Sequence, residues 1–170
     1  LSPKWIRGLV SGRFIVDSRR ALLARRSGKP PVYYFPRADI DMSALTESPA
    51  GPGGRQDERT RYWDLAVAGR KVPHAAWEHT EALPNTPQLI DCIAFEWASM
   101  DAWFEEDEQV FVHPRDPFVR VETLRSSRHI RLRVDGETIA ESHSPVLLFE
   151  TGLPTRYYLP RTHVRQDLLI

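Results

Sequence analysis

The sequence predicts a mainly β protein: a small sandwich or partly closed barrel of short strands, with one short helix per copy, arranged as a tandem duplication. Short apolar runs alternate with turn signals roughly every 8–12 residues, which is typical of such folds and not of an α/β sheet. In addition, the pattern Gly-x-Pro-x-x-Tyr-Tyr-x-Pro-Arg occurs twice, at residues 28–37 and 152–161. The constant spacing of 124 residues indicates two copies of one structural unit.

The repeat extends beyond this pattern but stops before a second full copy. Residues 2–45 align without a gap with residues 126–169, and 15 of these 44 pairs are identical. A truncated chain is the favoured interpretation, and the lack of a methionine before Leu1 agrees with a fragment or a processed protein. The alternative is that the half-copy completes a sheet, either on the first copy or on another chain. We expect a complete copy at 1–112, a linker at 113–125 and the N-terminal half of a second copy at 126–170.

Composition and charge exclude several classes of protein. With 41% hydrophobic and 27% charged residues, the chain is globular and not disordered. Lys plus Arg and Asp plus Glu both number 23, so we expect neither nucleic acid nor an anionic membrane as a partner. The single cysteine, Cys92, excludes an internal disulfide and an all-cysteine metal site, and it favours a cytoplasmic location. No apolar run has the length of a membrane span, and the N-terminus lacks a signal-peptide core.

The first elements of each copy are predicted to be hairpins, at residues 5–17 and 129–141. In the second copy Asp135-Gly136 supplies the two left-handed positions of a tight turn. Ser11-Gly12 takes the same place in the first copy.

The next segment carries conflicting signals in the two copies. Residues 18–28 have a serine cap at one end and a glycine stop at the other, which is typical of a helix. The equivalent residues 144–149 contain an internal proline and a short apolar run, which is typical of a strand. Because equivalent segments of a repeat should fold alike, we predict a strand in both copies.

Each Tyr-Tyr pair is predicted to lie in an extended segment between prolines. Adjacent residues of a strand point to opposite faces, so we expect one tyrosine of each pair to pack inward and the other to face solvent or a cleft. Pro36 and Pro160 suit the first turn of the short helix expected in each copy, which would end near Leu45 or Leu169.

The rest of the first copy is predicted to be a loop followed by further strands. Residues 46–59 are rich in glycine, proline and charged residues, which is typical of a loop. Four strands are expected, at residues 61–67, 72–77, 89–97 and 102–112.

Several short motifs then occur in a recognisable order. After the first Tyr-Tyr pattern they are Tyr62-Trp63, Ala75-Ala76-Trp77, Ile93-Ala94-Phe95, Asp101-Ala102-Trp103-Phe104-Glu105-Glu106-Asp107-Glu108, His113-Pro114-Arg115-Asp116-Pro117 and Ser126-Ser127-Arg128-His129. Together they resemble the bacterial domain of unknown function family 427, in its tandem two-copy actinobacterial form with the second copy truncated. The resemblance covers most of the chain and implies small, mostly β domains in tandem. The family also carries a nucleotidyltransferase label.

One stretch departs from that family. Members usually carry Cys-Pro-aromatic-Lys-Gly between the short helix and the Tyr-Trp strand, whereas residues 51–59 here contain neither cysteine nor lysine. If that stretch belongs to a working site, the first copy has lost it. The second copy ends before reaching it.

Catalytic chemistry of the nucleotidyltransferase kind needs paired carboxylates that hold Mg²⁺ against phosphates. Asp39-Ile40-Asp41 has that spacing, but its equivalents in the second copy are His163 and Arg165, and acidic residues also cap helix starts. Residues Glu105 to Glu108 could bind a cation, although a solvated strand end or turn explains them more simply. The histidines show no metal-ligand spacing, and Cys92 is interpreted as a small core residue. We therefore expect no cofactor and no metal, and leave catalytic residues unassigned.

The remaining interpretation is a binding site made of aromatic and arginine side chains. An aromatic cleft with a few polar anchors suits a small ligand, and arginine pairs with carboxylates or phosphates in a forked geometry. The opposing interpretation is that the tryptophans fill the core and the arginines lie on the surface. The candidate ligand-binding residues are Tyr34, Arg37, Trp97, Trp103, Arg115, Tyr158 and Arg161.

The sequence as a whole favours a soluble module that binds a small molecule or a protein partner through the Tyr-Tyr-x-Pro-Arg region. One alternative is a metal-dependent nucleotidyltransferase-like enzyme, which only the family label suggests. Another is an interaction scaffold that pairs through strand edges, with a homo-oligomer formed through the half-copy.

Overall fold

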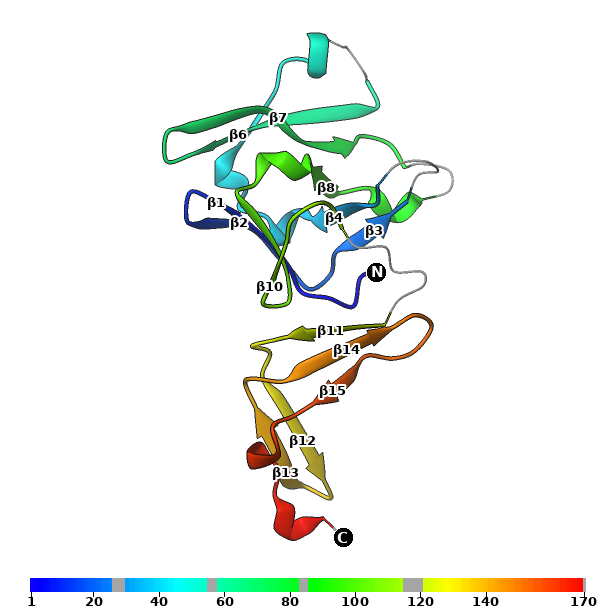
Figure 1. Cartoon of the computed structure of the whole chain (residues 1–170). Coiled ribbons are helices and arrows are strands. Elements are labelled where there is room, and N and C mark those ends of the chain that lie inside the picture. The colour runs from blue at the N-terminus through cyan, green and yellow to red at the C-terminus, as the bar shows by residue number, and fades with distance from the viewer. Residues whose placement is uncertain (26–29, 55–57, 83–85, 115–120, 170) are drawn as a thin grey trace. The chain divides into compact units, whose positions relative to one another are not determined.

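The computed structural model describes residues 1–25, 30–54, 58–82, 86–114 and 121–169. The chain divides into two compact units (Figure 1). The prediction of a mainly β protein is confirmed. The sheets of the described residues are antiparallel, and none of them closes into a barrel. Unit 1 comprises Leu1–Glu105 and Gln109–Arg115, and unit 2 comprises Glu106–Glu108 and Asp116–Ile170.

Unit 1 contains two antiparallel sheets, with strand orders β3-β4-β8-β7-β6-β5 and β10-β9-β1-β2. Two-residue turns at Ser11-Gly12 and Ala68-Gly69 join β1 to β2 and β6 to β7. Both residues of each turn have positive φ, as tight hairpins of this kind require. The strands are β1 (Ile6–Val10), β2 (Arg13–Ser18), β3 (Leu22–Ala24), β4 (Val32–Pro36), β5 (Leu45–Glu47), β6 (Thr60–Val67), β7 (Arg70–His79), β8 (Cys92–Phe95), β9 (Ala102–Glu105) and β10 (Glu108–Val110).

The core of unit 1 combines side chains from both sheets. Ile6 and Trp103 come from the smaller sheet, Phe35 and Ile93 come from the larger one, and none of the four is more than 3% exposed. Gly8 pairs with Trp103 across β1 and β9, and a Cβ atom at Gly8 would lie 3.0 Å from the indole ring. The large ring therefore packs against the strand because glycine leaves the space beside it open.

Both tyrosines of the first pair are buried, so neither faces solvent in this copy, while Tyr34 borders a cavity, as the alternative of a cleft allowed. Tyr33 is 4% exposed and belongs to the main core, whereas Tyr34 is 2% exposed and packs with Leu89 and Cys92 in a second cluster. The two side chains still alternate between the faces of β4, but each face has its own apolar cover. Cys92 is a buried core residue, and burial raises the pKa of its thiol.

Unit 2 contains a three-stranded sheet in the order β11-β14-β15 and a separate hairpin of β12 and β13. Asp135 and Gly136 form the predicted turn of this hairpin, with φ values of 48° and 87°. Its apolar cluster is small and consists of Leu124, Leu147 and Phe149. The strands are β11 (Val121–Arg125), β12 (Ile130–Val134), β13 (Glu137–Ser142), β14 (Val146–Glu150) and β15 (Arg156–Tyr158).

Elements and contacts recur 124 residues apart. Strands β12, β13, β14 and β15 begin 124 residues after β1, β2, β3 and β4, and the strand predicted for the ambiguous segment is present in both units as β3 and β14. The Ser2 Oγ accepts a hydrogen bond from the Lys4 backbone N–H at 3.3 Å. The Ser126 Oγ accepts the equivalent bond from Arg128 at 3.2 Å.

The second tyrosine pair is exposed where the first is buried. Tyr157 is 47% exposed and Tyr158 is 54% exposed. In unit 1 the strand that carries Tyr34 pairs with β8, where Tyr34 lies opposite Ala94. Among the described residues, β15 pairs with β14 alone, so nothing equivalent to β8 covers its tyrosines.

Two single-turn 3-10 helices replace the one short helix expected in each copy. Asp41 caps the second of them by accepting a backbone N–H, and three residues are too few for an α-helical turn to continue. The turns are η1 (Arg37–Asp39) and η2 (Met42–Ala44) in unit 1, and η6 (Arg161–His163) and η7 (Gln166–Leu168) in unit 2; further turns are η3 (Pro52–Gly54), η4 (Pro87–Leu89) and η5 (Trp97–Ser99).

Three predicted segments also differ from the structure. The strand expected at 102–112 is a hairpin of β9 and β10, because Glu106 takes a left-handed φ of 54° and the chain reverses there. The connection expected at 113–125 contains β11, and the described part of the loop at 46–59 contributes β5.

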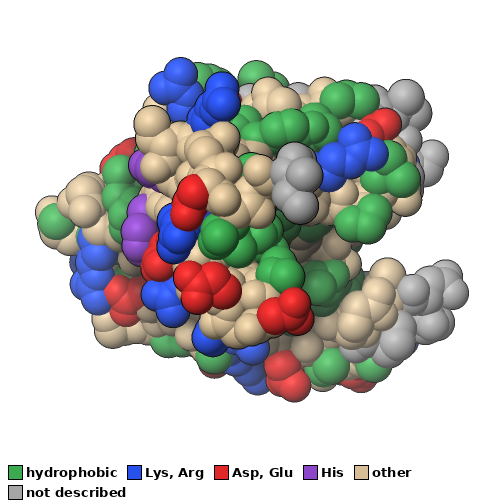
Figure 2. Space-filling model, turned by 90° about the horizontal axis from the view of Figure 1, so that it is seen from below, with side chains coloured by type: hydrophobic (Ala, Val, Ile, Leu, Met, Phe, Trp, Pro, Cys, Tyr) green, Lys and Arg blue, Asp and Glu red, His purple; other side chains and the backbone are tan. Residues whose placement is uncertain are grey.

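The surface carries charges of both signs. On the face shown in Figure 2, basic and acidic side chains are interspersed with hydrophobic ones. Within the described parts of the chain, no helix is long and apolar enough to cross a membrane.

The Glu141 carboxylate in unit 2 leads to a prediction for how the melting temperature depends on pH. Hydrogen bonds with Arg131 and His129 lower the pKa of Glu141 from 4.5 to about 2. A carboxyl group with a lowered folded-state pKa stabilises the fold above its unfolded pKa, and this stabilisation is lost as the pH falls through the folded value. We expect Glu141→Gln to flatten the decrease of melting temperature between pH 4.5 and about 2.

A pH series of thermal melts followed by circular dichroism measures this effect. Glu58→Gln, which removes an exposed carboxylate in unit 1, is the control and should keep the slope of the unaltered protein. Equal slopes for the unaltered protein and Glu141→Gln over this interval would contradict the prediction.

Candidate functional site

Unit 1 contains a cavity of about 510 Å³ that is lined mainly by apolar and aromatic side chains. Its walls come from β4, from the end of β8 with the following Glu96 and Trp97, from β9, and from residues 112–114. Ligand sites in proteins typically have volumes of about 300–1,000 Å³ and an apolar lining, so the size is suitable for a small molecule. The aromatic residues of the lining are Tyr33, Tyr34, Phe35, Trp77, Phe95, Trp97 and Trp103.

Three rings of the lining form a stacked column. The Phe35 and Trp103 centroids are 5.8 Å apart with ring planes 11° from parallel, and the Trp103 and Trp97 centroids are 5.0 Å apart with planes at 19°. Phe35 and Trp103 are buried, whereas Trp97 is half-buried. Trp97 is therefore the outermost ring of the column and the one that a ligand can reach.

Backbone hydrogen bonds hold Trp97 in this place. The Glu96 N–H donates to the Ala75 carbonyl at 2.9 Å and so attaches the chain to β7. The Ser99 N–H and its hydroxyl both donate to the Glu96 carbonyl, at 2.9 and 2.7 Å, which closes the turn η5. The Trp103 indole N–H donates to the Trp97 carbonyl at 2.9 Å, so the two stacked residues are also joined by a hydrogen bond.

Tyr34 lies in a small polar network at the wall of the cavity. The Trp77 indole N–H donates to the Tyr34 hydroxyl oxygen at 3.3 Å, and that hydroxyl lies 3.1 Å from His79 Nε2. Because the indole only donates, the Tyr34 O–H is available to the histidine nitrogen. The network fixes Tyr34 as a rigid part of the wall.

Two polar side chains complete the lining. Glu96 is exposed, and its carboxylate makes no hydrogen bond or ion pair with any residue that the structure describes. His113 Nδ1 lies 2.8 Å from the Pro114 carbonyl oxygen, and since a carbonyl only accepts, Nδ1 is the donor. The other ring nitrogen of neutral His113, Nε2, is then left as an acceptor.

Arg37 does not line the cavity, although the repeated pattern made it a candidate. Its guanidinium lies 3.1 Å from the buried Glu78 carboxylate, which also receives a hydrogen bond from Arg61 at 3.0 Å. The same guanidinium lies over the Trp63 ring, 5.0 Å from its centroid. Arg37 thus neutralises an internal carboxylate and stabilises the large sheet.

The other predicted residues lie elsewhere. Tyr158 and Arg161 belong to unit 2, where Tyr158 is exposed and Arg161 donates to the Gln166 side chain at 3.1 Å. Arg115 lies outside the described residues. The structure therefore brings together three of the seven candidates, namely Tyr34, Trp97 and Trp103.

The pair Asp39 and Asp41 is bound to arginines. Burial alone would raise the pKa of Asp39, but hydrogen bonds from Arg20 and Ser18 hold it below its usual range. A hydrogen bond from Ser43, helped by the charge of Arg13, lowers the pKa of Asp41. Each carboxylate is occupied by its own partners and positions the turns η1 and η2.

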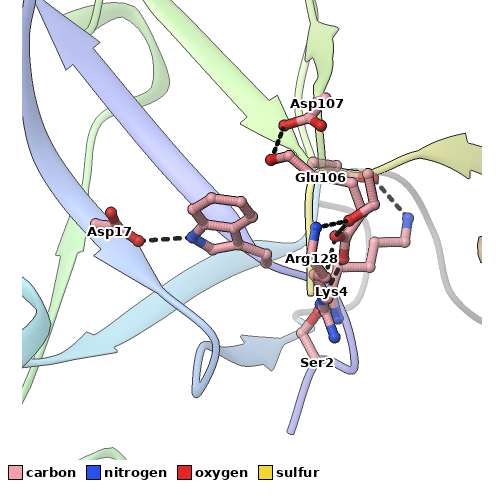
Figure 3. Close-up of polar contacts among 10 residues, drawn as sticks. Ser2, Lys4, Asp17, Glu106, Asp107 and Arg128 are labelled. Carbon is pink, nitrogen blue, oxygen red and sulfur yellow. Dashed lines mark hydrogen bonds and ion pairs between the residues drawn. The ribbon is translucent and has the colours of Figure 1, made fainter. Parts of the chain in front are cut away.

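Glu105 and Glu106 are buried, so the interpretation of residues 105–108 as a solvated turn is wrong for these two. The Glu105 carboxylate lies 2.5 Å from Lys4 Nζ, and the Glu106 carboxylate lies 2.5 Å from Arg128 (Figure 3). Burial of a carboxylate requires such a partner. In the described ranges, no group of three His, Cys, Asp or Glu side chains is arranged to hold a metal ion.

Sequence reasoning missed Trp77 and His113 as residues of this site. Trp77 lies in a strand that the hydrophobic pattern alone assigns to the core. Its hydrogen-bond partner, Tyr34, lies 43 residues away in the chain, so the local sequence gives no sign of this contact. His113 lines the cavity from beyond the chain reversal between β9 and β10, which the sequence presents as one strand.

The fold and the cavity define the class of protein. It is a mainly β protein of small antiparallel sheets, and its unit 1 contains an aromatic cavity. The chain belongs to the family described as "Domain of unknown function (DUF427)", whose model matches residues 2–106 and 122–170. Among curated proteins, no relative matches the chain.

Proposed function

We propose that unit 1 is a small-molecule-binding module and that its site is the aromatic cavity beside β4. The observation that carries the proposal is the combination of a 510 Å³ apolar cavity with a half-buried tryptophan, Trp97, at the end of a rigid ring column. Buried aromatic walls provide apolar contact area at a low cost in conformational entropy because the rings are already fixed. The site uses the tyrosines of the Tyr-Tyr-x-Pro-Arg pattern and not its arginine.

A thermal-shift screen of a metabolite panel, with nucleotides included both with and without Mg²⁺, tests this proposal. A ligand at one hundred times its dissociation constant stabilises the protein by about 2.7 kcal/mol, which such a screen detects. We expect at least one hit whose shift is lost in Trp97→Leu. The matched control is Trp5→Leu, which removes another half-buried tryptophan that does not line the cavity and should keep the shift.

Two results would contradict the proposal. One is a panel without any hit, and the other is a hit that Trp97→Leu leaves unchanged. A Mg²⁺-dependent nucleotide shift that Asp39→Ala with Asp41→Ala abolishes would favour the transferase-like alternative instead. The arginine partners of both carboxylates do not support that alternative.

A further inference from the structure

The chemistry of the cavity narrows the class of ligand. Among the described residues of its lining, Glu96 is the only one with a formal charge at neutral pH when His113 is neutral. Its carboxylate has no partner among the described residues, whereas its backbone N–H and C=O are both used within the fold. An unpaired carboxylate beside aromatic surface attracts a positive charge and repels a negative one.

The aromatic rings add to this preference. A cation within about 6 Å of an indole centroid is attracted by the negative face of the ring, and tryptophan is the strongest partner of this kind. Trp97 ends the column of stacked rings, so one of its faces is not covered by Trp103. Arg37, which could have competed for an aromatic face here, lies over Trp63 instead.

The cavity also selects the type of cation. A primary ammonium group needs several acceptors when it leaves water, because each unsatisfied N–H costs free energy. The lining is mostly carbon and offers few acceptors, of which His113 Nε2 is one. Methyl groups on the nitrogen remove the donors and match the apolar walls.

We propose that the ligand of this cavity is an organic cation with an alkylated ammonium group, held between the Trp97 face and the Glu96 carboxylate. This inference rests on the proposed function of the cavity as a small-molecule site. A hydroxyl group on the same ligand can donate a hydrogen bond to His113 Nε2.

Three probes of nearly equal shape test the charge preference: choline, the neutral 3,3-dimethylbutan-1-ol and the anionic 3,3-dimethylbutanoate. Binding is followed by two-dimensional NMR through the indole N–H signal of Trp97 in the whole chain. We expect choline to bind about fivefold or more tightly than the neutral alcohol, because the cation–π contact with Trp97 and the attraction to the Glu96 carboxylate both favour choline and neither favours the alcohol. The anion should bind most weakly.

Variants separate the contribution of the Glu96 carboxylate to choline binding from that of the Trp97 ring. Glu96→Gln keeps the side-chain size and should reduce the preference for choline over the alcohol to about twofold or less, while the exposed Glu58→Gln should leave it unchanged. Trp97→Phe, followed through the Trp103 indole signal, keeps an aromatic face and should retain part of the choline affinity that Trp97→Leu loses.

The outcomes distinguish this inference from the function on which it rests. Equal binding of choline and the alcohol, both lost in Trp97→Leu, would overturn the cation inference and leave the binding cavity in place. Tighter binding of the anion would overturn it. Probe binding that Trp97→Leu does not change would contradict both. No response of Trp97 to any of the three probes would overturn the cation inference, while a hit in the metabolite panel that depends on Trp97 would still support the binding cavity.

Discussion

Replacing Lys4 with methionine is expected to lower the free energy of unfolding of unit 1 by about 3–5 kcal/mol, the range found when one partner of a buried ion pair is removed. The Glu105 carboxylate is 1% exposed and is held by Lys4 Nζ at 2.5 Å and by the Tyr33 hydroxyl, which donates at 3.0 Å. Without the lysine the buried Glu105 carboxylate loses a positively charged partner at 2.5 Å. The fold must then either tolerate that charge or protonate the carboxyl group.

Urea unfolding monitored by tryptophan fluorescence measures this loss. Lys71→Met removes an exposed lysine in β7 and is the matched control, expected to change stability by no more than about 0.5 kcal/mol. Adding Glu105→Gln to Lys4→Met should restore much of the stability, because the amide oxygen still accepts from Tyr33 and position 105 no longer carries a charge. If Lys4→Met unfolds at the same urea concentration as Lys71→Met, the ion pair is not important for stability.

Replacing Arg128 with methionine is expected to unfold unit 2 selectively. The Glu106 carboxylate is fully buried and receives hydrogen bonds from Arg128 at 3.0 and 2.5 Å and from the Ser126 hydroxyl at 2.8 Å. Loss of the guanidinium costs about 3–5 kcal/mol by the same argument. Because the apolar cluster of unit 2 is small, this cost is comparable to the stability that a unit of this size can have.

Hydrogen exchange resolved along the chain distinguishes selective from global unfolding. In Arg128→Met the amides of β11 and β14 should exchange faster, while those of β4 and β8 in unit 1 keep their protection. Arg133→Met is the control, because the Arg133 guanidinium is exposed and, among the residues that the structure describes, bonds only to the Gly136 carbonyl. Unchanged protection of β11 and β14 in Arg128→Met would show that Glu106 does not need its arginine.

Local patterns predicted most of the elements. The two-residue turns at Ser11-Gly12 and Asp135-Gly136 follow from the few residues that accept positive φ, and both hairpins are present. The comparison of equivalent segments also predicted strands where residues 18–28 alone suggested a helix. These predictions succeeded for one physical reason. Turn chemistry and hydrophobic periodicity depend on a few neighbouring residues, so both can be recognised in the sequence alone.

The candidate site was predictable only in part. Tyr34, Trp97 and Trp103 were identified because aromatic residues are typical of small-ligand sites, and the structure brings them to one cavity. Arg37 was grouped with them because it shares a sequence pattern with Tyr34, yet it lies against Glu78. Spacing along a chain does not determine which buried carboxylate an arginine meets.

The sequence by itself determined the mainly β class, the hairpins, the family and the recurrence of elements at 124 residues. The tertiary structure alone decided which side chains are buried. Tyr33 and Tyr34 are covered on opposite faces of β4, whereas Tyr157 and Tyr158 occupy the same pattern and are exposed. Burial depends on which distant segments pack against a strand, and that pairing is a property of the whole fold and not of the local sequence.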